Sequence, residues 1–163
     1  MNAISVEDLS ALPIAHQAEI PDSYLDDMGH MNVMWYTHLF SCATIEFLEH
    51  IGMDRAYFTE NHSGAFALEA YVRYLAEIRV GKHVTVRTRL IGRSEKRFHF
   101  MHFLVIDEGP VLATTSEFIS AHIDMNVRRM SPIPETITTA YDALLRKHEQ
   151  LDWQPPLCGT MQP

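Results

Sequence analysis

A short polar segment that directly precedes an apolar helical pattern holds the residues best suited to chemistry. It spans residues 26–32, with the letters DDMGHMN, and the helical pattern begins at Val33. The first turn of a helix has unpaired N–H groups and a partial positive charge, so the N–H groups near Val33 could stabilise an oxyanion. A carboxylate held a few residues earlier could attack a carbonyl or activate a water. Asp26 and Asp27 are both candidates, and Gly29 allows a tight turn or a close backbone approach to a ligand.

The same residue types also have ordinary structural roles. Asp, Gly and Asn are common turn and cap residues immediately before a helix, so Asn32 could act only as an N-cap. Residue spacing by itself leaves both interpretations open.

A long helix must follow this segment. Apolar residues recur at three and four positions from Tyr36 to Ile51, which is typical of a helix with one broad apolar face. Gly52 is suited to end this helix. Further apolar residues, among them Val33 and Ile45, lie outside the main stripe. We therefore predict a helix that is buried nearly all round.

After a polar loop at Met53–Ser63, the apolar period changes from helical to alternating. We predict a short strand before the helix at His16–Ile20, four long strands after it, a C-terminal helix at Thr136–Glu149 and an irregular tail from Trp153. The four long strands are expected at 64–75, His83–Leu90, Phe98–Ile106 and Val111–Asp124. This order predicts an α+β fold in which an antiparallel sheet wraps around one long central helix. One helix covers only part of such a sheet, so we expect a homodimer or homotetramer.

Composition narrows the class of protein. The 163 residues fit a single domain, with a core at about 14–138 and a C-terminal helix and tail at 134–163. The start of the chain lacks a signal-peptide or membrane-span pattern, so we expect a cytoplasmic protein with no membrane partner. The net charge of −8 argues against nucleic acid. The stretch from Arg73 to Arg97 nevertheless has eight bases and two acids. It is either a solvated sheet face or a site for a small polyanion.

Metal and serine or cysteine chemistry are not indicated. The ten histidines do not converge on a ligand pattern, because His99 and His102 are three apart on a predicted strand and point to opposite faces. Cys42 and Cys158 form neither a disulfide framework nor a zinc motif. A Gly-x-Ser-x-Gly elbow is also missing from the sequence. We therefore expect no metal site.

The segment DDMGHMNVMWYTHLF resembles the D-x-x-G-H-x-N-x-x-x-Y signature of hotdog-fold acyl-CoA thioesterases related to 4-hydroxybenzoyl-CoA thioesterase. Three later segments are also similar to this family: VRYLAEIRVGKHVTVRTRLIG, SEKRFHFMHFLVI and RRMSPIPE. The resemblance covers about residues 14–138. It implies the hotdog fold and hydrolysis of an acyl-CoA thioester, with no cofactor because coenzyme A is part of the substrate.

The resemblance also implies roles for individual residues. The family's catalytic carboxylate falls on Asp26 rather than Asp27, and the oxyanion donors fall on N–H groups near Val33. His30 and Asn32 are expected to shape the loop and to hold the attacking water or the thioester. Tyr36 matches the family's tyrosine, although a packed core aromatic is an equal interpretation.

This chain departs from the family at one position. An acidic residue that often follows the family's tyrosine by five positions is Ser41 here. Glu46, further along the same helix, is a possible substitute. The departure leaves the role of a second helix carboxylate open, but it does not affect the role of Asp26.

Two binding functions follow from the same resemblance. The phosphates of coenzyme A are expected to meet basic side chains, for which the candidates are Arg93, Lys96, Arg97, Arg128 and Arg129. Gly29 and Trp35 are the further candidates for substrate contact. The run MGHMNVMWY is most similar to thioesterases of carnitine and betaine catabolism, whose substrate is betainyl-CoA. Trp35 or Tyr36 could bind that quaternary ammonium through a ring face, or Trp35 could simply be packed.

Two other functions are compatible with this fold. The enzyme alternative is a dehydratase or hydratase of 3-hydroxyacyl thioesters, although its His-then-carboxylate pattern is not visible in the sequence. The non-enzyme alternative is an acyl-CoA-binding protein, in which a carboxylate at position 26 would be dispensable. Loss of thiol release on changing Asp26 would separate hydrolysis from both.

Overall fold

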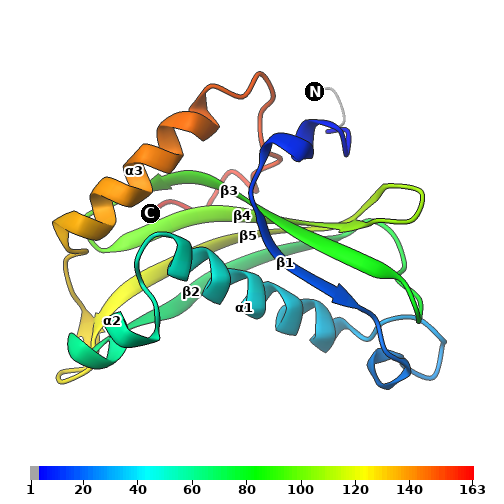
Figure 1. Ribbon diagram of the computed structural model, residues 1–163, viewed down its shortest axis with the longest axis horizontal. Helices are drawn as coiled ribbons and strands as arrows, with labels where there is room; N and C mark the ends of the chain where they lie inside the picture. Colours follow the sequence, from blue (N-terminus) through cyan, green and yellow to red (C-terminus); the bar gives the residue numbers. More distant parts are fainter. Residues whose placement is uncertain (1–3) are drawn as a thin grey trace. The chain divides into compact units, whose positions relative to one another are not determined.

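The computed structural model describes residues 4–163 (Figure 1). The chain begins with η1 (Asp8–Ala11), β1 (Ile14–Glu19), η2 (Asp22–Tyr24), α1 (Val33–His50) and α2 (Arg55–Glu60). It continues with β2 (Ser63–Tyr74), β3 (His83–Arg93), β4 (Arg97–Ile106), β5 (Val111–Asp124), β6 (Arg129–Met130) and α3 (Glu135–Glu149). Every predicted strand and both predicted helices are present, with ends shifted by a few residues. The predicted α+β class is therefore confirmed.

The strands form one six-stranded sheet. Their order is β1-β3-β4-β5-β2, and β6 pairs with β5. β1 runs antiparallel to β3, with His16 opposite Val86 and Glu19 opposite His83. The path ends at β1 on one side and at β2 on the other, so β2 is an edge strand. Among the described residues, no helix has the length and apolar character that crossing a bilayer requires.

Close contacts divide the chain into two compact units. The first contains the chain up to Glu46, together with Val72–Thr88 and His102–Ser116. The second contains Phe47–Tyr71, Arg89–Met101 and the chain from Glu117 onward. Strands β2 to β5 each contribute to both units, so neither unit is one continuous piece of the chain.

Helix α1 begins and ends at the predicted residues. The side-chain oxygen of Asn32 accepts a hydrogen bond from the backbone N–H of Met34 at 3.1 Å, which is an N-cap. At the other end, Gly52 has φ +92°, and the Met53 N–H donates to the Leu48 carbonyl at 2.8 Å. This is a Schellman motif with glycine in the left-handed position. Both predicted caps are therefore confirmed.

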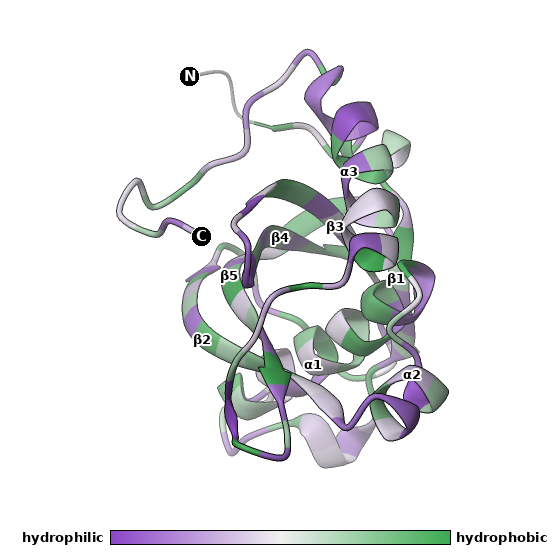
Figure 2. Cartoon of the chain, turned by 90° about the vertical axis from the view of Figure 1, so that its left-hand side faces the viewer, coloured by the Kyte–Doolittle hydropathy of each residue, from purple (hydrophilic) through white to green (hydrophobic). Residues whose placement is uncertain are grey.

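The prediction that α1 is buried nearly all round is wrong for the chain by itself. Its main stripe is buried, as at Leu39, Phe40 and Ala43, but Val33 is 61% and Ile45 is 55% exposed. Hydrophobic residues lie along much of α1 (Figure 2). The sheet of one chain contacts only one face of a helix, so the second apolar face has no cover within this chain.

The segment predicted as a polar loop at Met53–Ser63 contains the short helix α2. The side chain of Asp54 accepts a hydrogen bond from the Tyr57 N–H at 2.8 Å and caps this helix. The Tyr57 hydroxyl then hydrogen-bonds the imidazole of His122 on β5 at 2.8 Å. This helix was missed from the sequence, because six residues are too few to show an apolar period; the N-cap residue Asp54 is the local signal that could have indicated it.

The basic stretch between Arg73 and Arg97 is not a uniformly solvated sheet face. Arg89 is only 5% exposed. It donates to the carbonyl of Trp153 at 2.8 Å and to that of His148 at 3.2 Å, and its guanidinium lies 4.1 Å from the Trp153 ring centroid. The C-terminal tail is irregular as predicted, and Arg89 anchors it.

A fully buried histidine lies under α1. His102 hydrogen-bonds the hydroxyls of Thr44 and Thr88, each at 2.9 Å, and stacks on Phe40 with 5.8 Å between ring centroids. Burial lowers the pKa of His102 from 6.5 to about 3. His102 is therefore neutral in the folded protein over the whole physiological pH range.

This histidine predicts a loss of stability in mild acid. Below pH 6.5 the unfolded chain binds a proton that folded His102 does not take up, so the free energy of unfolding falls as pH is lowered toward 3. The loss is about 1.4 kcal/mol per pH unit at most. Urea unfolding at pH 7.5 and pH 5 measures it, and in His102→Gln the difference between the two pH values should shrink by about 2 kcal/mol. An unchanged difference would show that folded His102 titrates normally.

Candidate active site

The 26–32 loop is held tightly by backbone hydrogen bonds. The Asp26 N–H donates to the His30 carbonyl, and the Gly29 N–H donates to the Asp26 carbonyl, both at 3.0 Å. Gly29 has φ +79°, a left-handed conformation that side chains disfavour. The Met31 N–H donates to the Ile78 carbonyl at 2.8 Å, which attaches the loop to the segment after β2. The loop is therefore a compact turn that fixes the side chains on it.

The structure distinguishes Asp26 from Asp27 as a candidate catalytic carboxylate. One oxygen of Asp26 accepts a hydrogen bond from the Met28 N–H at 2.9 Å, and the other lies 3.4 Å from Nδ1 of His30. The Asp26 side chain is 27% exposed. Asp27 is exposed, and none of the described side chains hydrogen-bonds its carboxylate. Only Asp26 is both oriented by the loop and directed at a second functional group.

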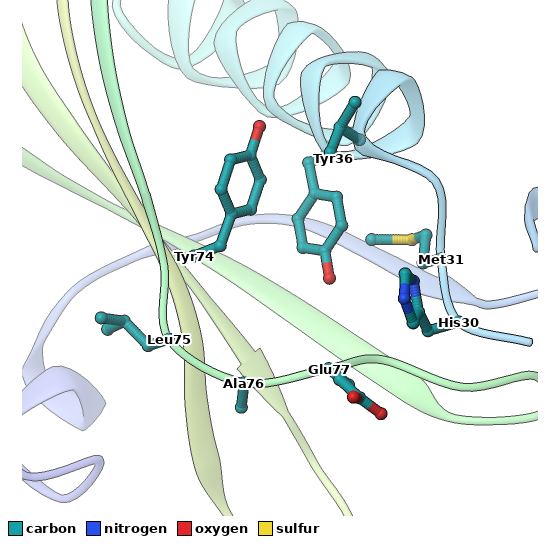
Figure 3. A pocket seen from close by; sticks show the side chains of 8 residues that line it. His30, Met31, Tyr36, Tyr74, Leu75, Ala76 and Glu77 are labelled. Atoms are coloured by element: carbon teal, nitrogen blue, oxygen red, sulfur yellow. The ribbon is translucent and has the colours of Figure 1, made fainter. Parts of the chain in front are cut away.

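A pocket of about 310 Å³ lies beside the loop and the start of α1. It is lined by His30, Met31, Val33, Tyr36, Tyr74, Leu75, Ala76 and Glu77. Figure 3 shows its side chains coming from three places: the loop, α1, and the end of β2 with the residues that follow it. The pocket therefore contains three residues predicted for catalysis, namely His30, Val33 and Tyr36.

Tyr36 is both a packed aromatic and a pocket residue. It is 4% exposed, and its ring packs edge-on against Tyr74 with 5.0 Å between centroids and 81° between planes (Figure 3). Burial raises the pKa of the Tyr36 hydroxyl, and a hydrogen bond with the Ile78 backbone opposes part of that effect. The phenol is therefore neutral, and the two interpretations of this residue are not exclusive.

The first turn of α1 has one N–H group free for a ligand. The Met34 N–H is bound by the Asn32 side chain at 3.1 Å, and the Trp35 N–H donates to the Asn32 carbonyl at 3.0 Å. Among the described residues, none accepts a hydrogen bond from the Val33 N–H. Val33 is also 61% exposed and lines the pocket. A carbonyl oxygen in the pocket could therefore accept a hydrogen bond from Val33 at a helix N-terminus.

Comparison with known proteins identifies the family. The family model described as the thioesterase-like superfamily matches residues 20–141. The chain belongs to this superfamily. The resemblance found in the sequence is confirmed.

Two curated relatives are informative. An L-carnitine dehydrogenase/betainyl-CoA thioesterase of Agrobacterium fabrum is 34% identical over 82% of this chain. A betainyl-CoA thioesterase of Pseudomonas aeruginosa is 27% identical over 88% of this chain. This chain spans 27% of the length of the Agrobacterium protein and 90% of that of the Pseudomonas protein.

A solved structure supports the fold. A hypothetical protein from Staphylococcus aureus, determined in complex with CoA, matches with a TM-score of 0.82 at 23% identity. The match covers 100% of this chain and 99% of that one. The hotdog fold expected of a thioesterase-like chain is therefore confirmed.

Two candidate residues of α1, Trp35 and Glu46, lie outside the pocket lining. Trp35 stacks on Tyr24 with 3.7 Å between ring centroids and 8° between planes, so one of its faces is covered. Glu46, considered as a substitute for the acidic residue that is Ser41 here, binds Nδ1 of His16 at 2.6 Å. Neither is among the eight lining residues.

The predicted phosphate-binding residues of this thioesterase-like chain all lie in the second unit. Arg93 forms two hydrogen bonds of 2.6 Å with the carboxylate of Asp142 on α3. Arg128 has φ +53° and lies over the Phe66 ring at 5.7 Å. Arg129 is exposed, and Lys96 and Arg97 are partly exposed at the β3–β4 turn. A phosphate at Arg93 would have to compete with Asp142. Among the described residues, no group of three potential ligands is placed to hold a metal ion.

Sequence reasoning missed two pocket residues that bear polar groups, Tyr74 and Glu77. Tyr74 lies in the alternating strand predicted at 64–75, and Glu77 lies in the connection after it. Their place in the pocket depends on the hydrogen bond between the Met31 N–H and the Ile78 carbonyl. No local sequence pattern indicates such a contact between distant segments.

Proposed function

We propose that this protein is an acyl-CoA thioesterase whose catalytic carboxylate is Asp26. The observation that carries the proposal is the arrangement around the pocket. Val33, whose N–H has no acceptor among the described residues, lines the pocket, and the Asp26 carboxylate lies 3.4 Å from His30, which also lines it. An oxyanion donor and an oriented carboxylate are the two groups that hydrolysis of a thioester requires. The curated betainyl-CoA thioesterases among the relatives support the same reaction.

In the proposed reaction the thioester carbonyl oxygen accepts a hydrogen bond from the Val33 N–H. Negative charge that develops on this oxygen is stabilised by the N-terminus of α1. Asp26 either takes a proton from a water that attacks the carbonyl carbon or attacks that carbon itself to form an anhydride, which water then cleaves. In both routes the carbon–sulfur bond breaks, the CoA thiolate leaves and is protonated, and the free acid forms. His30 and the Met28 N–H hold the Asp26 carboxylate in place.

The pocket favours a short acyl group. Its volume of about 310 Å³ lies at the lower end of the range of about 300–1,000 Å³ for small-molecule sites. Betainyl-CoA, on which the curated relatives are named as acting, carries such a group.

Release of free thiol from a panel of acyl-CoA thioesters tests this function. The panel contains betainyl, short-chain, medium-chain and aromatic thioesters, assayed with the native protein. We expect rapid cleavage of a short acyl group and slow cleavage of medium chains. Absence of thiol release from every thioester would refute the proposed activity and would favour an acyl-CoA-binding or hydratase function.

We also propose that two copies of the chain associate through β2. This 12-residue edge strand is exposed along most of its length, including Phe66, Leu68 and Tyr71. A long apolar edge with unpaired backbone groups is a site at which another strand adds. The exposed face of α1 provides further apolar surface for the same partner.

A charge on this edge should separate the copies. Leu68 is 44% exposed, so the folded chain itself should tolerate Leu68→Lys, whereas a paired edge should not. We expect the native protein to be at least a dimer by light scattering and Leu68→Lys to shift it to monomer at micromolar concentration. Leu157→Lys, at 41% exposed on the C-terminal tail, is the matched control and should leave the mass unchanged. A monomeric native protein, or a dimer that persists in Leu68→Lys, would contradict this assembly.

A further inference from the structure

We propose that Tyr36, Tyr74 and Glu77 form a subsite that recognises a quaternary ammonium group on the acyl part of the substrate. This inference rests on the proposed thioesterase function and deepens it, because it names the chemical feature that the pocket selects. The three residues line the same pocket as Val33, where the thioester carbonyl is proposed to lie. A cation close to the carbonyl would therefore fall among them.

The aromatic part of the subsite is open to a ligand. The rings of Tyr36 and Tyr74 are nearly perpendicular, at 81° with 5.0 Å between centroids, so together they present a face and an edge (Figure 3). Tyr74 is 51% exposed, whereas Tyr36 is 4% exposed. The accessible ring face therefore belongs mainly to Tyr74. The faces of aromatic rings attract cations, and quaternary ammonium groups are a recurrent ligand of such sites.

The charge of the pocket has the sign that this ligand requires. Glu77 contributes a carboxylate, and none of the eight described lining residues is a lysine or an arginine. The Glu77 carboxylate also lies 3.3 Å from the Arg79 guanidinium, with both side chains more than 60% exposed. Exposed ion pairs of this kind are weak and are screened by salt, so this pair does not neutralise the pocket toward a cation.

The same lining disfavours an acyl group that carries a negative charge. A quaternary ammonium has no N–H to satisfy and is bound by ring faces and a diffuse negative charge. An acyl group that ends in a carboxylate would be repelled by Glu77. Trp35, the aromatic residue first considered for this role, is not in the lining and has one face covered by Tyr24. We therefore assign recognition of the cation to Tyr74 and Glu77, with Tyr36 packed edge-on against Tyr74.

Two thioesters of the same shape isolate the effect of charge. Betainyl-CoA and 3,3-dimethylbutyryl-CoA differ only in that a quaternary nitrogen replaces a quaternary carbon. Dissociation constants for both are measured by calorimetry in the Asp26→Asn background, in which hydrolysis is expected to be at least about 100-fold slower. Hydrolysis of both is measured with the native protein. We expect betainyl-CoA to bind about tenfold or more tightly than its neutral isostere.

Substitutions in the subsite should reduce that preference. Tyr74→Leu and Glu77→Gln are each expected to lower it about threefold to tenfold, while Tyr74→Phe should retain most of it because the ring face remains. Arg79→Gln tests whether Glu77 matters only through its ion pair, and it should not lower the preference. Glu149→Gln removes the same charge from an exposed position on α3 and should have no effect.

The outcomes separate the subsite from the proposed function. Hydrolysis of both thioesters without a charge preference would overturn the subsite and leave the thioesterase function standing. A charge preference in binding without any hydrolysis would support the subsite and overturn the function. An Arg79→Gln variant that loses as much preference as Glu77→Gln, or a Tyr74→Leu variant that loses none, would overturn the subsite. Failure of both thioesters to bind would overturn both proposals.

Discussion

Asp26→Asn should lower the turnover number for thioester hydrolysis by at least about 100-fold while the protein stays folded. Asparagine keeps an oxygen that can accept the Met28 N–H, so the turn that holds position 26 is preserved. It has no carboxylate charge with which to attack a carbonyl or take a proton from water. Thiol release and circular dichroism of the same preparation are the two measurements.

Asp27→Asn is the matched control for this prediction. Asp27 adjoins Asp26 in the same loop, carries the same charge and is exposed. Its substitution should change turnover by no more than about twofold, since surface charges act weakly at a distance. Full activity of Asp26→Asn, or equal losses in both variants, would mean that Asp26 acts only as a turn residue.

The two chemical routes open to Asp26 are separable by isotope labelling. In a single turnover in ¹⁸O-labelled water, attack by Asp26 followed by hydrolysis of the anhydride at the Asp26 carbonyl places label in the Asp26 carboxylate. Direct attack by water places the label only in the acid product. Mass spectrometry of the Asp26 peptide distinguishes the two.

Glu117→Ala should lower the free energy of unfolding by about 3–5 kcal/mol. Glu117 is 0% exposed, and its two oxygens have different partners: Nε2 of His99 at 2.8 Å and the Cys158 N–H at 2.7 Å. The substitution leaves the buried His99 ring and the partly buried Cys158 N–H without an acceptor and creates a cavity. It also releases the C-terminal tail at Cys158. Urea unfolding at neutral pH measures the change.

The position of the glutamate determines this effect. Glu149→Ala changes the same residue type at an exposed site on α3 and should alter stability by no more than about 0.5 kcal/mol. Glu117→Gln keeps the shape and one acceptor oxygen, so its loss should be smaller than that of Glu117→Ala. A change below about 1 kcal/mol in Glu117→Ala would show that water or tail movement satisfies both partners.

Local sequence was sufficient to predict the helices and strands whose ends and apolar faces are set by neighbouring residues. The caps at Asn32 and Gly52, the 3.6-residue period between them and the alternation of the strands predicted α1 and the strands correctly. These features depend on backbone geometry and on residues within one or two turns. The D-x-x-G-H-x-N pattern assigned the catalytic carboxylate to Asp26 rather than Asp27, and that role stays a prediction. The structure adds that the Asp26 carboxylate lies 3.4 Å from Nδ1 of His30.

The tertiary structure decided which distant segments meet. The pocket depends on the attachment of Met31 to Ile78, and this contact brings Tyr74 and Glu77 beside His30. Burial of Arg89 and Glu117 involves a tail more than 30 residues away in sequence, so no local pattern marks these two charged residues as buried. The sequence alone therefore determined the local elements and the loop that bears the catalytic candidates. Strand order and long-range contacts determined the pocket. These contacts are stabilised by burying surface between segments that are distant in sequence, and no local pattern records which segments will meet.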